Sequence, residues 1–132
     1  IRYQEKFPCY CSRTGCIETF LSGPGFERDY ELYTGNALEA YQVVELAEKG
    51  EANAELCLQR YEQRLGKALA GLINTLDPDI IVLGGGMSNI TQLYSNLKPL
   101  MSNWVFGKEC ATKVRQAMHG DSSGVRGAAW LW

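Results

Sequence analysis

The sequence DIIVLGGG at residues 79–86 decides the fold class of this chain. Residues 79–83 begin with an aspartate and continue as an apolar run, which predicts a strand buried in a parallel sheet. Three glycines follow at its carboxyl end, and Ser88 or Asn89, both good helix caps, would begin a helix soon after. A strand, a glycine turn and a helix in this order predict an α/β fold.

Upstream of this unit, the strongest helical pattern covers residues 52–76, where apolar side chains recur every three or four residues. They are Leu58, Tyr61, Leu65, Leu69, Leu72 and Leu76. The charged side chains expected to face elsewhere are Glu62, Arg64 and Lys67. Gly66 and Gly71 each cost about 1 kcal/mol relative to alanine inside a helix, so we expect them to allow close packing against a neighbouring element.

Shorter elements are predicted from turn formers and local periodicity. Phe26, Tyr30 and Tyr33 follow each other at intervals of four and three, which places their rings on one helical face. The expected helices before the long one lie at residues 16–21, from Ser22 or Gly23 to Gly35, and at 37–48. The features expected after the glycine turn are a kink or helix end at Pro99, a strand at 114–117, a polar turn at 119–124 and an apolar helix at 125–132.

The sequence CYCSRTGCIE at residues 9–18 carries three cysteines within eight positions. Thiolates suit zinc, and Gly15 permits the tight turn that brings Cys16 back toward Cys9 and Cys11. Ordinary reduced thiols and disulfides are the alternatives, although an odd number of five cysteines argues against a disulfide framework. A structural zinc site normally has four protein ligands, so the fourth is expected on chain outside this sequence.

Cys57 and Cys110 are expected to be packing residues, because free cysteine behaves as a small apolar side chain. His119 is the single histidine of the sequence. It lies in a polar turn far from the cysteine cluster, and we do not assign it to a metal.

The glycines Gly84, Gly85 and Gly86 are a second candidate site, for a nucleotide. Glycines let a ligand approach the backbone, and ligands of open α/β sheets bind at the carboxyl ends of strands. The residues around the triplet match neither the Rossmann fingerprint nor the P-loop. A tight turn without a ligand is the alternative interpretation.

Composition narrows the class of protein. The 132 residues carry a net charge of −2, and 45% of them are hydrophobic, which is ordinary for a globular domain. Scattered basic residues, outnumbered by acids, do not predict a nucleic-acid surface. The sequence contains no run of eighteen apolar residues, so it predicts no membrane span. We therefore expect a cytoplasmic protein. The chain begins at Ile1 and ends at Trp132, and we expect the C-terminal part of a longer protein.

Taken together, these motifs resemble the C-terminal half of the ROK family (repressor, open reading frame, kinase), which contains bacterial sugar kinases and sugar-responsive repressors. The family motif is Cys-x-Cys-Gly-x-x-Gly-Cys-x-Glu, and residues 9–18 depart from it once, at Ser12. The resemblance continues through SGPG at residues 22–25, LDPD at 76–79 with the glycine triplet, and HGDSSGVRGAA at 119–129.

The resemblance implies a fold and a set of site residues. The fold is the actin/hexokinase-like (ribonuclease H-like) fold of sugar kinases, of which residues 1–132 would be a single C-terminal domain fragment. Cys9, Cys11 and Cys16 would hold a structural zinc together with an upstream histidine. Glu18 would accept hydrogen bonds from sugar hydroxyls, or else be an exposed or capping glutamate. The three glycines would border ATP.

The resemblance also implies an activity. The closest similarity is to fructokinases of the mannokinase type, which transfer the ATP γ-phosphate to a hexose with magnesium. N-acetylglucosamine kinase, and a non-catalytic sugar-sensing regulator that would bind nucleic acid through an additional domain, are the alternatives. A homodimer is expected. The family's phosphate loop and catalytic aspartate precede the cysteine motif and are absent from this sequence, so the chain alone is expected to be inactive.

Overall fold

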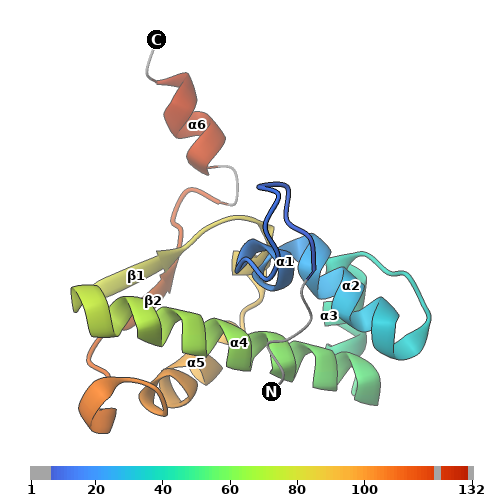
Figure 1. Ribbon diagram of the computed structural model, residues 1–132, viewed down its shortest axis with the longest axis horizontal. Helices are drawn as coiled ribbons and strands as arrows, with labels where there is room; N and C mark the ends of the chain where they lie inside the picture. Colours follow the sequence, from blue (N-terminus) through green and yellow to red (C-terminus); the bar gives the residue numbers. More distant parts are fainter. Residues whose placement is uncertain (1–6, 121–122, 131–132) are drawn as a thin grey trace. The chain divides into compact units, whose positions relative to one another are not determined.

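The computed structural model describes residues 7–120 and 123–130, which form a mixed helix and sheet structure (Figure 1). The chain divides into two compact units, Ile1–Arg64 and Leu65–Trp132. One long helix, α4 (Ala52–Leu76), contributes residues to both units. The sequence alone does not reveal this division. Each unit is described below by itself.

The first unit is helical. It contains α1 (Glu18–Leu21), α2 (Gly23–Thr34), α3 (Ala40–Glu48) and the first half of α4. Its most buried side chains come from α2, α3 and α4 and include Phe26, Tyr30, Val43, Cys57, Leu58 and Tyr61. The rings of Phe26 and Tyr61 meet edge to face, with centroids 5.5 Å apart, an arrangement that aromatic pairs prefer.

The helix boundaries in this unit follow capping chemistry. The Ser22 side chain accepts a hydrogen bond from the Gly25 N–H at 3.1 Å and so caps α2, as the sequence predicts. Gly35 ends α2 with a φ of 74°. Helix α3 begins at Ala40 rather than at residue 37, because Glu39 and Gln42 form a reciprocal capping box.

The three aromatic side chains of α2 differ in exposure. Phe26 and Tyr30 are buried, but Tyr33, expected on the same face, is 63% exposed. The Arg60 guanidinium lies 4.0 Å from the centroid of the Tyr33 ring. Tyr33 is therefore held at the surface by a cation–π contact and is not part of the core.

The buried face of α4 is broader than the spacing of its leucines predicts. Leu58, Leu65 and Leu69 are buried as predicted, but Glu62, expected to face elsewhere, is only 4% exposed. Glu62 lies one turn after Leu58, and a core-facing helix buries a wide stripe that includes such positions. Leu72 and Leu76, expected to be buried, are 50% and 70% exposed near the end of the helix.

The two glycines of α4 differ. A Cβ on Gly66 would lie 3.0 Å from the Cβ of Leu100, which confirms that this glycine allows close packing between helices. A Cβ on Gly71 would meet no atom of the described residues within 4 Å. The expectation of close packing is therefore wrong for Gly71.

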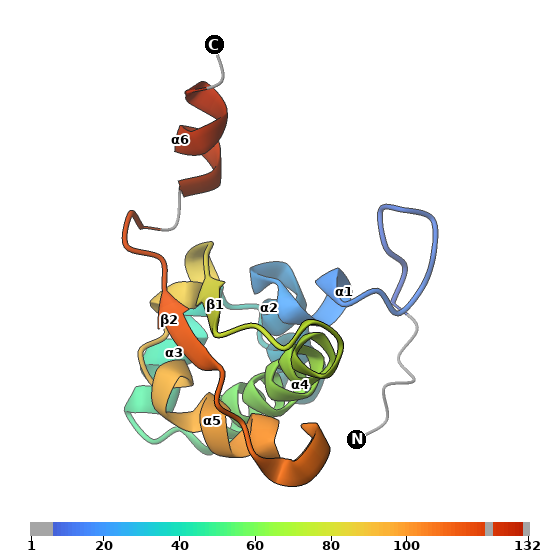
Figure 2. The same cartoon turned by 90° about the vertical axis from the view of Figure 1, so that its left-hand side faces the viewer.

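The second unit contains a parallel pair of strands, β1 (Ile80–Leu83) and β2 (Lys113–Gln116), in which Ile81 pairs with Val114. Figure 2 shows the two strands side by side, and helix α5 (Leu93–Ser102) packs against β2. The parallel arrangement agrees with the predicted α/β class. The prediction that this strand is buried is wrong for one face of β1 within the described residues, because Ile80 and Val82 are 54% and 61% exposed.

The chain after β1 forms a 3₁₀ turn, η1 (Gly86–Asn89), before α5. The sequence predicts a helix start near Ser88 or Asn89, and this is wrong, because α5 begins at Leu93. Pro99 does not end α5, which continues to Ser102. A proline inside a helix costs about 3 kcal/mol or more, and the complete burial of Leu97 and Met101 on either side of Pro99 offsets that cost.

Two further elements complete the second unit, η2 (Phe106–Lys108) and α6 (Ser123–Ala129). Helix α6 begins two residues before the predicted position, and Val125 is 76% exposed. Residues 121–122 of the predicted polar turn, and 131–132 of the predicted terminal helix, lie outside the described residues. No helix within the described residues is long and apolar enough to cross a membrane.

Candidate functional site

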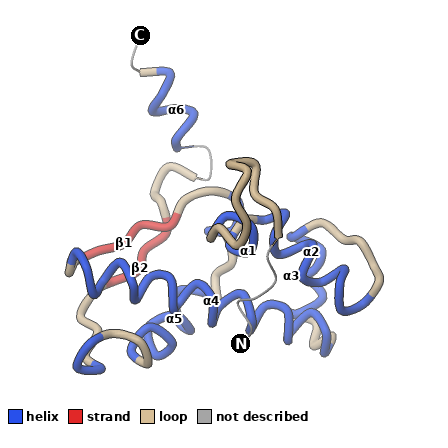
Figure 3. Tube along the Cα trace, viewed as in Figure 1, coloured by secondary structure: helices blue, strands red, loops and turns tan. Residues whose placement is uncertain are grey.

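The cysteine-rich segment folds back on itself as a small hairpin ahead of α1, and Figure 3 draws it as a projecting tan loop. Pro8 and Thr14 form an antiparallel bridge. The Cys9 N–H donates to the Arg13 carbonyl at 2.8 Å. This hairpin geometry brings the third cysteine back toward the first two, as the position of Gly15, with a φ of 71°, predicts.

The sulfur atoms of Cys9, Cys11 and Cys16 all lie within 4.8 Å of one another. Cys11 Sγ and Cys16 Sγ are 3.5 Å apart. A zinc ion bound tetrahedrally at about 2.3 Å from each sulfur would hold the sulfurs about 3.8 Å apart. All three thiols are free, and the donor set fits a soft cation such as zinc. The predicted metal-ligating residues are therefore brought together.

The thiols influence each other's protonation. A backbone hydrogen bond at Arg13, followed by hydrogen bonds from Cys16 and Cys9, lowers the pKa of Cys11. The hydrogen bond with Cys11, followed by that with Cys9, raises the pKa of Cys16 to about 11. Once one thiolate has formed, its neighbours resist ionisation because like charges repel. A bound cation would remove that conflict, since metal ligation favours the thiolate form.

Glu18, the predicted sugar-binding residue, begins α1 two positions after Cys16 and is exposed. Its carboxylate has no hydrogen-bond partner among the described residues, and it does not cap α1. The backbone N–H and hydroxyl of Thr19 both donate to the Cys16 carbonyl, at 2.9 and 2.7 Å. The turn that carries Glu18 is therefore fixed to a predicted metal ligand, and the carboxylate remains available.

The glycine triplet lies at the carboxyl end of β1, and its three residues are exposed. Gly85 has a φ of 78°, which favours glycine, but a Cβ on Gly84 or Gly86 would meet no atom of the described part of the chain within 4 Å. Crowding within the described chain therefore does not require glycine at those two positions. Because a four-residue 3₁₀ turn follows, an α-helix N-terminus does not contribute to this candidate site.

Sequence reasoning missed the side chains that support this turn. The Ser88 hydroxyl donates to the Gly85 carbonyl at 2.6 Å, and the Tyr94 hydroxyl donates to the Ser88 carbonyl at 2.6 Å. Burial raises the pKa of Tyr94 and keeps it a donor. The spacing of a serine three residues after a turn glycine was the available signal.

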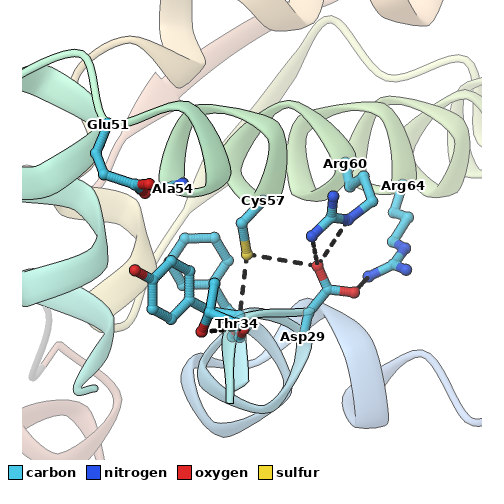
Figure 4. A network of polar contacts seen from close by, with 9 residues as sticks. Asp29, Thr34, Glu51, Ala54, Cys57, Arg60 and Arg64 are labelled. Carbon is cyan, nitrogen blue, oxygen red and sulfur yellow. Dashed lines mark hydrogen bonds and ion pairs between the residues drawn. The ribbon is translucent and has the colours of Figure 1, made fainter. Parts of the chain in front are cut away.

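Sequence reasoning also missed a buried ionic network in the first unit (Figure 4). Asp29, on α2, is 6% exposed and accepts from Arg60 at 2.8 Å and Arg64 at 2.9 Å. The Cys57 thiol donates to the same carboxylate at 3.4 Å. Burial, and then the Asp29 charge, raise the pKa of Cys57 to about 12. Cys57 and Cys110 are both buried, as expected of packing residues.

His119 lies in the exposed turn after β2 and is not among the residues that form the thiol cluster. The cysteine hairpin belongs to the first unit and the glycine turn to the second.

Residues 2–132 match the sequence model of the ROK family, and the chain belongs to that family. Its relatives include N-acetyl-D-glucosamine kinases. That of Photobacterium profundum is 41% identical over 125 residues, which are 95% of this chain and 41% of the relative. That of Salmonella typhi is 37% identical over 123 residues, which are 93% of this chain and 41% of the relative. The chain spans about two fifths of the length of these relatives.

Solved structures agree on the fold. A ROK hexokinase from Thermus thermophilus superposes with a TM-score of 0.77 at 27% identity, over 93% of this chain and 42% of that protein. A ROK glucokinase from Streptomyces griseus, in complex with glucose and AMPPNP, gives a TM-score of 0.82 at 24% identity. The match covers 96% of this chain and 47% of that protein. The chain is a fragment of the actin/hexokinase-like fold of these kinases, as the resemblance implies.

Proposed function

We propose that this chain is the C-terminal part of an ATP-dependent hexose kinase. One observation carries the proposal. Three thiols converge within 4.8 Å at the base of a turn that presents the exposed carboxylate of Glu18, in a chain of the ROK family. A metal-anchored loop of this kind is suited to holding one carboxylate at a fixed place against sugar hydroxyls.

The residues of this chain would have distinct tasks. Cys9, Cys11 and Cys16 would ligate zinc, which would supply positive charge and fix the three sulfur positions. Glu18 would accept hydrogen bonds from two hydroxyl groups and orient the sugar. Gly84 would let the nucleotide approach the backbone at the end of β1. ATP and magnesium would supply the phosphoryl group and the charge neutralisation that its transfer requires.

We propose N-acetylglucosamine as the first substrate to test. Relatives at 41% and 37% identity are N-acetyl-D-glucosamine kinases, and they support this alternative over the fructokinase type that the sequence resemblance places first. Fructose, mannose and glucose are the comparison sugars. A homodimer in the cytoplasm remains part of the proposal.

The test is ATP-dependent phosphorylation by the protein extended to the length of its relatives. Each of the four sugars is offered separately, with and without a zinc chelator. We expect turnover with N-acetylglucosamine and its loss on chelation. The variant Glu18→Gln keeps the size of the side chain and removes its charge, so we expect a raised KM for the sugar with ATP affinity preserved.

The rival function is that of a sugar sensor without catalysis. Sugar binding without turnover on any of the four sugars would contradict the kinase and favour the sensor. Turnover with fructose alone would keep the kinase and overturn the proposed substrate. Full activity of Glu18→Gln with an unchanged KM would remove Glu18 from the sugar site.

A further inference from the structure

Arg28, on the inner side of α2, joins the two ends of the cysteine hairpin. Its guanidinium donates a hydrogen bond to the Thr19 carbonyl, just after the hairpin. The same group lies 4.3 Å from the centroid of the Phe7 ring, just before the hairpin. A single side chain therefore contacts both flanks of residues 8–18.

The contact at Thr19 leads directly to a thiol ligand. The hydroxyl and the backbone N–H of Thr19 both donate to the Cys16 carbonyl. Thr19 is 8% exposed, so these bonds are shielded from competing water. Glu18 precedes Thr19 in the same turn. A displacement of Thr19 would therefore move a metal ligand and the candidate sugar carboxylate together.

Helix α2 is shaped for this contact. A Cβ on Gly25 would lie 2.7 Å from the Thr19 carbonyl oxygen and 2.9 Å from the Cα of Phe20. Glycine at this position lets α2 approach the backbone of α1, and Arg28 follows three residues later on the same helical face. The Nε of Arg28 is buried and has no hydrogen-bond partner among the described residues. The guanidinium is thus held by the carbonyl and the ring.

We propose that Arg28 is the positioning residue of the cysteine hairpin, and that it sets both the metal affinity of the hairpin and the placement of Glu18. The inference rests on the proposed metal and sugar sites. Arg28 contacts neither the thiols nor the carboxylate, and it acts through Thr19 and Phe7. Groups hydrogen-bonded to metal ligands typically change metal affinity about 10- to 100-fold when they are removed. Arg28 holds such a group, because Thr19 donates to the Cys16 carbonyl.

The test measures Co²⁺ affinity through the thiolate-to-cobalt absorption band, and sugar kinetics, in the protein extended to the length of its relatives. Arg28→Met removes the charge and the donors. Arg28→Lys keeps the positive charge and a hydrogen-bond donor group. Lys49→Met is the control, because Lys49 is 71% exposed, lies outside the hairpin and loses the same charge on substitution.

We expect Arg28→Met to weaken Co²⁺ binding about 10- to 100-fold and to raise the sugar KM more than it lowers kcat. Arg28→Lys should recover most of the affinity, and Lys49→Met should resemble the unmodified protein. Helical circular dichroism should be equal in all variants. Unchanged affinity in Arg28→Met, or equal losses in Arg28→Met and Lys49→Met, would overturn the inference.

The failure of the proposed function would look different. If the unmodified protein binds Co²⁺ but phosphorylates no sugar, the kinase proposal fails while the affinity series still decides the role of Arg28. If the unmodified protein binds no metal, the inference about Arg28 fails with the metal site. Kinase activity with an intact affinity series supports both.

Discussion

Ser12 has a φ of 66°, in the left-handed region that favours glycine. The residue lies at the turn of the cysteine hairpin, where its N–H donates to the Cys9 carbonyl at 2.9 Å. It is also the one position at which the cysteine motif departs from the family pattern it resembles. The hairpin forms with serine at this position, so the bonds around Ser12 impose a conformation that serine rarely adopts.

Ser12→Gly should stabilise the hairpin. Glycine adopts a positive φ without the clash that a Cβ causes, so we expect the free energy of unfolding to rise by up to about 1 kcal/mol. Urea denaturation followed by circular dichroism measures the change. Ser12→Ala, which retains the Cβ, is the control and should give no gain. A loss of stability in Ser12→Gly would mean that the serine side chain supports the turn.

At the scale of elements, the contact between α2 and α4 depends on a buried charge. The Arg60 and Arg64 side chains are 25% and 16% exposed, and both pair with the carboxylate of Asp29, which is 7% exposed. Breaking such a pair leaves cations partly buried without a partner, which is more costly than losing a surface ion pair.

Asp29→Ala should therefore lower the free energy of unfolding by about 2–4 kcal/mol, because the arginines retain some access to water. Thermal and urea unfolding measure the loss. The control is Glu45→Ala, which removes the exposed ion pair with Lys49 on α3 and should cost less than about 0.5 kcal/mol. Equal effects of the two variants would show that the Asp29 network does not stabilise the first unit.

The periodicity of the sequence predicts where helices and strands lie better than it predicts which side chains are buried. The long helix α4 and the two strands follow from apolar spacing, and the start of α2 follows from Ser22. Periodicity could not predict that Glu62 is buried, because its burial depends on how the rest of the unit packs around α4. Nor could it predict the 3₁₀ turn at residues 86–89, where the short supporting bonds of Ser88 and Tyr94 decide the backbone.

At the scale of the whole molecule, the sequence predicted site residues more readily than their supports. Three cysteines within eight positions indicate a metal site by ligand chemistry alone, and the hairpin brings their sulfurs together. The contribution of Arg28 depends on a contact between residues nine positions apart in the chain, and no motif marks it. The sequence could not show that the described chain divides into two units, since α4 continues through the boundary.

The isolated chain of 132 residues should not phosphorylate sugars. The phosphate loop and the catalytic aspartate implied by the family resemblance have no counterpart in this sequence, and phosphoryl transfer requires both positioned phosphates and a base. Coupled measurement of ADP release with N-acetylglucosamine tests the expectation, with the extended protein as the positive control. Turnover by the isolated chain above the background without sugar would contradict it.

No atom of the described chain fills the space beside Gly84, so a substitution there can distinguish an effect on folding from an effect on nucleotide binding. Gly84→Ala should change the free energy of unfolding by less than about 0.5 kcal/mol, because the added methyl group meets no atom of the described chain within 4 Å. Gly85→Ala, at a φ of 78°, should be destabilising. If Gly84→Ala folds normally yet raises the KM for ATP, the bound nucleotide is what requires glycine there. An unchanged KM would assign the glycine to the turn alone.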